Sequence, residues 1–195
     1  ERIGVVELFG RNSGETSLFS AYLAYVDRAV IPEVECDVAE LCELLVEDKR
    51  NCPSNYAIMT ISEGAVLKGM DIIESGEADA YGHKKLGGVG RIMAEEIKRR
   101  TGHHIMFQQP GYLMRSGAPD SLDRMVAMSF GNLAGQLLLK GDTGKMVALQ
   151  NGCYTAIPID YIMSGKKIVE IDKYYDVEQY RPHIKDILGV PMFLQ

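Results

Sequence analysis

The chain has 195 residues and a formal net charge of −6, and hydrophobic residues make up 46% of it and charged residues 25%. This length and balance fit one domain of ordinary size with a hydrophobic core. No apolar run approaches the length that spans a bilayer, and the acidic net charge with scattered basic residues argues against a nucleic-acid partner. We therefore expect a globular protein that binds neither membrane nor nucleic acid.

Short apolar runs alternate with longer helical periods along the chain. The pattern predicts strands over 3–9, 28–31, 56–61, 104–108 and 145–149, each bounded by turn or cap residues. It predicts helices from Ser13 onward and over 37–48, 86–101 and 121–140. Strands that alternate with helices form βαβ units, so we expect an α/β fold with a mostly parallel sheet and helices on both faces.

The segment 165–195 differs in character because it is charged and rich in tyrosine. We interpret it as a C-terminal extension of the body formed by 1–164. It is predicted to hold a short helix near 177–188 and to end in apolar residues that pack back on the body. The polar stretch 67–85 is predicted to be a surface excursion.

Two further patterns do not indicate a site. The glycine run Gly87–Gly90 is a weak candidate for a dinucleotide loop, but it lacks the G-x-G-x-x-G spacing; a helix start and close helix packing explain it better. The four cysteines show neither C-x-x-C spacing nor a nearby histidine at zinc-finger spacing, so we expect reduced thiols in a cytoplasmic protein and no metal site. They are Cys36, Cys42, Cys52 and Cys153.

The residues after the first strand could bind an anion. Gly10 and Gly14 allow close backbone approach, the start of a helix offers free N–H groups, and Arg11 adds a positive charge. An ordinary strand-to-helix turn with a surface arginine would give the same pattern. In an open α/β sheet, however, ligands bind beyond the carboxyl ends of the strands, which is where these residues lie.

Two other strand ends carry residues of the same kind. Glu63 follows the third strand and precedes a glycine, which suits hydrogen bonds to sugar hydroxyls, although a solvated loop glutamate is an equal alternative. The loop after the fourth strand carries Arg115 and Arg124 nine residues apart. Arg124 lies in the first turn of a helix, where a cation opposes the helix dipole unless an anion lies between them.

Five segments occur in an order that resembles the 6-phosphofructokinase family. Residues 5–14 resemble its VEVMGR…G segment, 31–33 its IPE, 62–65 its EGA, 111–124 its GHxQRGGxP…DR and 144–149 its GxMVAL strand. The resemblance covers residues 1 to about 151 and implies the three-layer α/β/α fold of that family. It identifies 1–164 as the C-terminal, fructose 6-phosphate-binding part of a glycolytic enzyme.

The resemblance also implies roles for three arginines. Arg11, Arg115 and Arg124 match family positions that bind fructose 6-phosphate. Arg11 additionally matches a residue that steadies charge on the transferring phosphoryl group, a reaction in which positioning and electrostatics dominate.

Further substrate contacts follow from the same resemblance. Phe9 and Gly10 match backbone contacts to the sugar, and Glu63 matches the carboxylate that holds its hydroxyls. Arg2 matches an arginine that reaches the substrate phosphate of a neighbouring subunit, which implies a homo-oligomer, a dimer or tetramer in the full-length enzyme.

Features of the family that do not occur in this sequence are equally informative. The family's glycine-rich nucleotide loop, its Mg²⁺-binding aspartate and its catalytic-base aspartate precede the matched region. We therefore expect this polypeptide to be inactive alone. The resemblance implies that the phosphoryl donor (ATP or pyrophosphate) and Mg²⁺ are bound mainly by the N-terminal half of the enzyme. Tyr112, Met114 and Ser116 replace the usual His, Gln and Gly, which indicates a divergent branch.

Asp27 aligns with an acidic effector-site position of bacterial members of the family. The basic partners expected near 52–54 are instead Cys52, Pro53 and Ser54, so activation by a nucleotide effector is not expected. Two alternatives to the enzyme fragment are a non-catalytic sugar-phosphate-binding or regulatory module of the same fold and a nucleotide-binding Rossmann-like domain. The latter depends on the Gly87–Gly90 run alone.

Overall fold

The computed structural model describes residues 2–69, 74–75, 85–86, 88–165 and 168–183. These residues fall into two compact units. The first unit holds the described residues up to Tyr112 together with 168–183, and the second holds 113–165.

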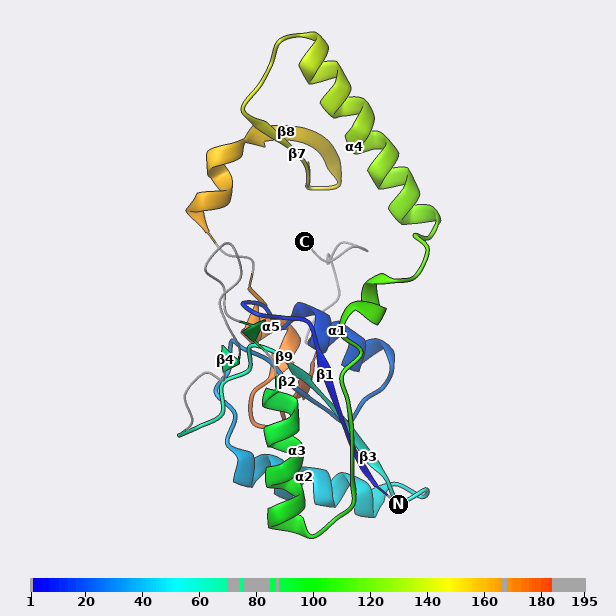
Figure 1. Ribbon diagram of the computed structural model, residues 1–195, viewed down its shortest axis with the longest axis vertical. Helices are drawn as coiled ribbons and strands as arrows, with labels where there is room; N and C mark the ends of the chain where they lie inside the picture. Colours follow the sequence, from blue (N-terminus) through cyan, green and yellow to red (C-terminus); the bar gives the residue numbers. More distant parts are fainter. Residues whose placement is uncertain (1, 70–73, 76–84, 87, 166–167, 184–195) are drawn as a thin grey trace. The chain divides into compact units, whose positions relative to one another are not determined.

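The first unit is built on a four-stranded parallel sheet (Figure 1). Its strands are β1 (Ile3–Leu8), β2 (Arg28–Val30), β3 (Ala57–Ser62) and β6 (Ile105–Gln108), in the order β2-β3-β1-β6. The corresponding predicted strands are confirmed to within one residue at each end. Short runs of apolar and β-branched residues form these strands because such side chains fit a pleated surface that is covered on both sides.

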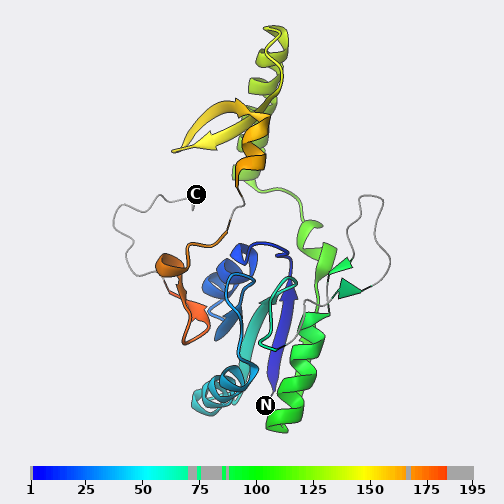
Figure 2. The same cartoon turned by 90° about the vertical axis from the view of Figure 1, so that its left-hand side faces the viewer.

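Helices cover both faces of this sheet. α1 (Glu15–Leu23) joins β1 to β2, α2 (Val38–Asn51) joins β2 to β3, and α3 (Val89–Thr101) precedes β6. Parallel crossovers are right-handed, and the chain crosses the sheet in one direction through α1 and in the other through α2 and α3. α1 therefore lies on one face and α3 on the other (Figure 2). α2 packs against α3 on the same face. The predicted α/β/α fold is confirmed.

Residues at the helix ends set the boundaries of α2 and α3. Asp37 is the N-cap of α2, because its side chain accepts hydrogen bonds from the backbone N–H groups of Ala39 (2.9 Å) and Glu40 (3.4 Å). Gly88 is the N-cap of α3 and has a φ of +96°, a conformation that glycine adopts readily. This turn starts α3 at Val89, three residues after the predicted start.

The core of the first unit lies between the sheet and its helices. The strands contribute buried side chains on both faces of the sheet, and the helices contribute one face each. The largest fully buried apolar side chains are Ile3, Leu18, Ile31, Leu41, Leu45, Met59, Ile61, Leu67, Met93 and Ile97.

Residues 168–183 complete the first unit. They form the short helix α5 (Ile171–Tyr174) and the antiparallel pair β9 (Tyr175–Asp176) and β10 (Arg181–Pro182). The buried Tyr175 hydroxyl donates to Ala29 O (2.6 Å), and the Tyr180 hydroxyl accepts from the backbone N–H of Asp37 (3.0 Å). The helix predicted near 177–188 is therefore wrong over 177–183, because these tertiary contacts fix a turn and a strand there. Its remainder lies outside the described residues.

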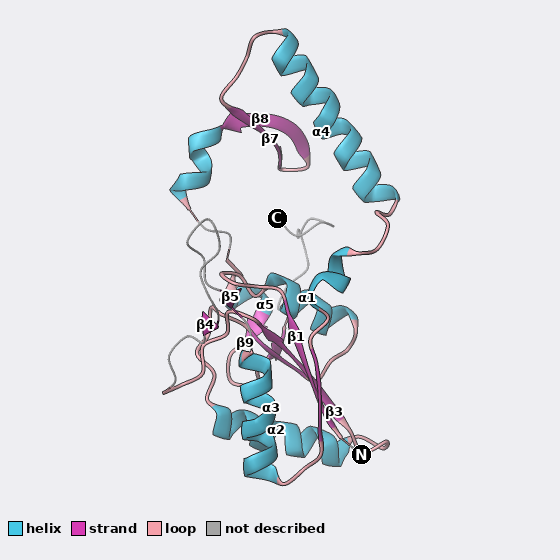
Figure 3. Cartoon of the chain, viewed as in Figure 1, coloured by secondary structure: helices cyan, strands magenta, loops and turns pink. Residues whose placement is uncertain are grey.

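The second unit has a different architecture (Figure 3). It contains α4 (Ser121–Leu139), the antiparallel hairpin of β7 (Lys145–Gln150) and β8 (Cys153–Pro158), and the 3₁₀ helix η2 (Ile159–Ser164); the 3₁₀ helix η1 (Gly111–Arg115) bridges the unit boundary. The strand predicted over 145–149 is confirmed, but it pairs antiparallel with β8, which the sequence analysis missed. None of the described residues of this unit is buried.

Much of the predicted surface excursion over 67–85 lies outside the described residues. Its described part includes β4 (Glu74–Ser75), which pairs antiparallel with β5 (Lys85–Leu86). Among the helices that the structure describes, none has the length and apolar character to cross a membrane.

Candidate functional site

Two turns meet at one edge of the parallel sheet. β1 and β3 are neighbours in register, with Leu8 opposite Ser62, so the residues that follow them emerge side by side. We call these segments the β1 turn (residues 9–14) and the β3 turn (residues 63–65). The backbone N–H of Glu63 donates to Leu8 O (3.0 Å), and that of Gly64 donates to Gly10 O (3.2 Å). The two turns therefore form one continuous backbone surface.

Glycine is required where the turns touch. A Cβ atom on Gly64 would lie 2.0 Å from Arg11 O, and one on Gly10 would lie 2.6 Å from Ser13 O. Gly10 also has a φ of +152°, which other residues rarely adopt. The sequence analysis expected Gly10 to allow close backbone approach to a ligand; the structure shows that Gly10 allows the β1 turn to close on itself and that Gly64 allows the β3 turn to meet it.

Glu33, which follows β2, fixes the end of the β1 turn. The backbone N–H of Gly14 donates to both carboxylate oxygens of Glu33 (3.0 Å each), and the backbone N–H of Val169 donates to Glu33 Oε1 (2.9 Å). A Cβ on Gly14 would lie 2.3 Å from Ile31 Cβ, so this glycine is also sterically required. The sequence analysis recognised 31–33 as a motif but assigned Glu33 no role.

Glu7 in β1 organises the start of α3 in a similar way. Its side chain is 2% exposed, and it accepts hydrogen bonds from the backbone N–H groups of Gly88 (3.2 Å) and Gly90 (2.8 Å) and from the Gln109 side chain (2.6 Å). A carboxylate is favourable at a helix N-terminus. A Cβ on Gly90 would lie 2.8 Å from Phe107, which confirms helix start and close packing as the role of this glycine run within its described part. A glutamate inside an apolar strand was the signal that could have identified Glu7.

The structure brings four of the seven predicted substrate-binding residues together. Phe9, Gly10 and Arg11 lie in the β1 turn and Glu63 in the β3 turn. Phe9 also packs edge to face on Tyr112, with ring centroids 5.8 Å apart. Arg11 is exposed and Glu63 is partly exposed, so both can face a ligand in solvent.

The other three predicted residues lie elsewhere. Arg2 precedes β1 at the opposite edge of the sheet, a full strand length of roughly 20 Å from the β1 turn. Arg115 ends η1, and Arg124 lies in the first turn of α4, where its Nε donates to Pro119 O (3.2 Å). Arg115 and Arg124 are exposed and belong to the second unit, whereas Phe9, Gly10, Arg11 and Glu63 belong to the first.

Asp27, the predicted effector position, is engaged in structural hydrogen bonds. Its carboxylate accepts from the backbone N–H of Ile58 (2.8 Å), and its backbone oxygen accepts from Arg181 Nε (3.2 Å). A small cavity of about 270 Å³ beside it is lined by Tyr22, Tyr25 and Arg181, among others.

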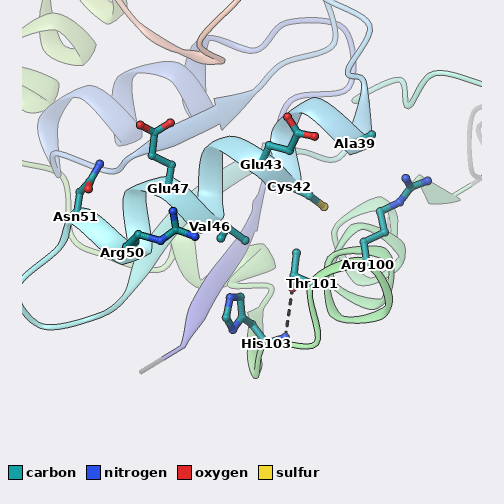
Figure 4. Close-up of a pocket in the computed structure, with 10 residues that line it drawn as sticks. All are labelled: Ala39, Cys42, Glu43, Val46, Glu47, Arg50, Asn51, Arg100, Thr101 and His103. Carbon is teal, nitrogen blue, oxygen red and sulfur yellow. Dashed lines mark hydrogen bonds between the residues drawn. The ribbon is translucent and has the colours of Figure 1, made fainter.

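A larger groove of about 710 Å³ lies between α2 and α3 (Figure 4). Its lining carries both signs of charge, with Glu43 and Glu47 on one helix and Arg50 and Arg100 near the ends of the two helices. The ends of α2 and α3 lead into β3 and β6, so this end of the groove lies toward the amino ends of the strands, away from the β1 and β3 turns. None of the predicted site residues lines it.

The described residues show no cluster suited to a metal ion, and one of the cysteines, Cys36, is inaccessible. Cys36 is fully buried, and burial raises the pKa of its thiol far above the usual value. Within the described ranges, no group of three or more His, Cys, Asp or Glu side chains is arranged to hold a metal ion.

Comparisons with known proteins agree on one family. A family model described as phosphofructokinase matches residues 1–138. The chain is 34% identical, over 178 residues, to a pyrophosphate–fructose 6-phosphate 1-phosphotransferase of Streptomyces coelicolor, a match that covers 90% of this chain and 51% of that protein. It is 31% identical to an ATP-dependent 6-phosphofructokinase of Corynebacterium efficiens, covering 89% of this chain and 50% of that protein.

The solved structures agree on the fold. A crystal structure of a pyrophosphate-dependent phosphofructokinase from Marinobacter aquaeolei superposes with a TM-score of 0.71 at 17% identity, covering 93% of this chain and 45% of that one. The chain thus spans about half the length of the curated relatives that it matches.

Proposed function

Because the chain belongs to the phosphofructokinase family, we propose that it is the sugar-phosphate-binding part of a 6-phosphofructokinase. The complete enzyme would transfer a phosphoryl group from ATP or pyrophosphate to fructose 6-phosphate. The observation that carries the proposal is the pair of abutting turns at the carboxyl ends of β1 and β3, which presents Arg11 and Glu63 side by side on a glycine-formed backbone surface. That edge of an open α/β sheet is where ligands bind.

The four predicted site residues of the two turns have roles suited to their chemistry. Arg11 supplies a planar cation that can pair with a phosphoryl group in the ground state and stabilise the charge that develops on transfer. Glu63 supplies carboxylate acceptors for sugar hydroxyls. Phe9 and Gly10 offer backbone groups at the base of the site, because Gly10 has no side chain to cover them.

Three further arginines would complete the binding of the sugar phosphate. Arg115 and Arg124 of the second unit would bind the substrate phosphate, and Arg124 at a helix start pairs well with an anion there. Arg2 lies at the far edge of the sheet and would serve the site of a neighbouring subunit in a homodimer or homotetramer. The domain limits of 1–164 and 165–195 and a cytoplasmic location are part of the same proposal.

The phosphoryl donor, Mg²⁺ and the catalytic base would come from protein outside this chain. Within the described residues, no group of three or more His, Cys, Asp or Glu side chains could hold a metal ion, so none of them is proposed as a ligand of Mg²⁺. Without metal and base, phosphoryl transfer loses most of its catalysis, so this polypeptide alone should not turn over.

Calorimetric titration of the purified chain with fructose 6-phosphate tests the proposal. We expect binding, and we expect Arg11→Ala to weaken it roughly ten-fold or more, the effect of losing a charge-assisted hydrogen bond. Arg99→Ala is the matched control, because Arg99 is an exposed arginine of α3 that pairs with Glu96 outside the site.

Four results would contradict this assignment. Binding of NAD without sugar phosphate would favour a Rossmann-like domain. If Arg11→Ala and the wild type bind fructose 6-phosphate with equal affinity, the β1 turn is not part of the binding site. Formation of fructose 1,6-bisphosphate by the isolated chain in a coupled assay would refute its inactivity. If the chain binds sugar phosphate but supports no turnover when combined with the other half of a relative, it is a regulatory module instead.

A further inference from the structure

One buried hydroxyl lies directly beneath the β1 turn. Ser62 is the last residue of β3 and is fully buried. Its Oγ is the one buried side-chain nitrogen or oxygen, among the residues that the structure describes, that makes no hydrogen bond. A Cβ atom built on Gly10 would lie 3.0 Å from this oxygen, which places the hydroxyl against the turn that carries Arg11.

The neighbouring buried hydroxyls show that pairing is possible in this part of the sheet. Ser17 Oγ donates to Thr60 Oγ1 (2.9 Å), and Thr60 Oγ1 in turn donates to Ser17 O (3.2 Å). Burying an unpaired hydroxyl is unfavourable, whereas alanine would fill nearly the same volume without that cost. A buried polar group without a partner calls for a specific explanation, and a partner gained in another state of the protein is one.

The β1 turn is the part of the surroundings that can supply this partner. Its backbone at Gly10 lies against Ser62, and it is held to the β3 turn by the 3.2 Å hydrogen bond from the Gly64 N–H to Gly10 O. Glycine at position 10 makes the backbone there permissive. Arg11 and Asn12, which follow Gly10, are exposed and face solvent where a ligand would arrive.

We propose that Ser62 is a positioning residue of the sugar-phosphate site, and this inference rests on the proposed function. When a sugar phosphate binds Arg11 and Glu63, the β1 turn shifts so that its backbone pairs with the Ser62 hydroxyl. The hydrogen bond then exists only in the ligand-bound state, so the hydroxyl stabilises that state relative to the free one. Differential stabilisation of this kind raises affinity without any contact between Ser62 and the ligand.

Two measurements on Ser62→Ala test the inference, because the substitution is predicted to stabilise the free protein and to weaken the binding of fructose 6-phosphate. The melting temperature of the free protein should rise, since an unpaired buried hydroxyl is removed. The Kd for fructose 6-phosphate should increase roughly five-fold, the effect of one net hydrogen bond. Ser17→Ala, which breaks a hydroxyl pair that is already formed, should lower the melting temperature and leave the Kd unchanged.

The outcomes separate this inference from the proposed function. If the wild-type chain does not bind fructose 6-phosphate, both fail. If it binds and Ser62→Ala binds equally well, only the role of Ser62 fails. A lower melting temperature for Ser62→Ala would also overturn the inference, because the hydroxyl would then be paired in the free protein.

Discussion

A buried ion pair that joins β2, α2 and the 168–183 segment gives the sharpest test of the fold. Arg28 is 3% exposed and donates from Nε and Nη2 to both carboxylate oxygens of Asp48, at 2.5 and 2.7 Å. Arg181 Nη2 adds a third hydrogen bond to Asp48 (3.2 Å), and Arg28 Nη1 donates to Gln179 O (2.6 Å). Asp48→Ala leaves the Arg28 guanidinium in place and removes the charge that compensates it.

The expected loss follows from burial. Removing one partner of a buried pair typically costs about 3–5 kcal/mol, because the other charge stays desolvated. That is a large share of the roughly 5–15 kcal/mol that stabilises a typical domain. For a chain of this size it corresponds to a fall in melting temperature of roughly 6–20 °C. Arg181 is 41% exposed, so water can solvate it and its share of the loss is small.

Urea unfolding followed by far-ultraviolet circular dichroism measures this loss. The control is Glu96→Ala, which breaks ion pairs with two exposed arginines of α3 and should cost less than about 1 kcal/mol. The double variant Arg28→Met/Asp48→Leu, which replaces the pair by apolar side chains, should lose less stability than Asp48→Ala. If Asp48→Ala and Glu96→Ala lose the same free energy of unfolding, the reasoning from burial is refuted.

Two further predictions concern the turns and the thiols. Gly64→Ala forces the β1 and β3 turns apart, so it should cost roughly 1–3 kcal/mol of stability and abolish fructose 6-phosphate binding in calorimetry. Gly4→Ala is the tolerated control, because its new Cβ would meet Ile58 at 3.5 Å. Equal effects of the two substitutions would contradict the steric argument. Because Cys36 is buried and Cys153 is exposed, a thiol reagent followed by mass spectrometry should label Cys153 in the folded chain and Cys36 only after unfolding; labelling of both at one rate would contradict that placement.

The parallel sheet was predictable because each of its strands is a short apolar run between turn residues. The hairpin of the second unit also had a local signal that the sequence analysis did not use. Asn151 and Gly152 connect β7 to β8 with φ values of +50° and +75°, as in a type I′ turn, and Asn-Gly is the preferred pair for that turn. Residues 177–183 had only a weak local signal, the Asp176 carboxylate that accepts from the backbone N–H groups of Glu178 (3.1 Å) and Gln179 (3.0 Å). Their conformation also depends on contacts with Asp37 and Arg28 that are distant in sequence.

The candidate site was predictable to a similar degree. Gly10, Arg11 and Glu63 follow strands, and the rule that ligands bind at the carboxyl ends of strands placed them at one edge. Glu33 and Ser62 were missed for a physical reason. The role of Glu33 depends on N–H groups 19 and 136 residues away, and Ser62 is distinguished only by the absence of a partner, which no sequence pattern encodes.

The two groups of proposed substrate residues differ in what fixes their positions. Arg11 and Glu63 are held by backbone contacts between turns that only glycine permits, on a unit with a buried core. Arg115 and Arg124 are carried by a unit in which no described residue is buried and α4 exposes Met125 and other apolar side chains. One helix and a two-stranded hairpin cannot form a stable core on their own. We therefore expect the placement of these two arginines to depend on contacts beyond the described residues of this unit, whereas the backbone contacts of the β1 and β3 turns lie within the first unit.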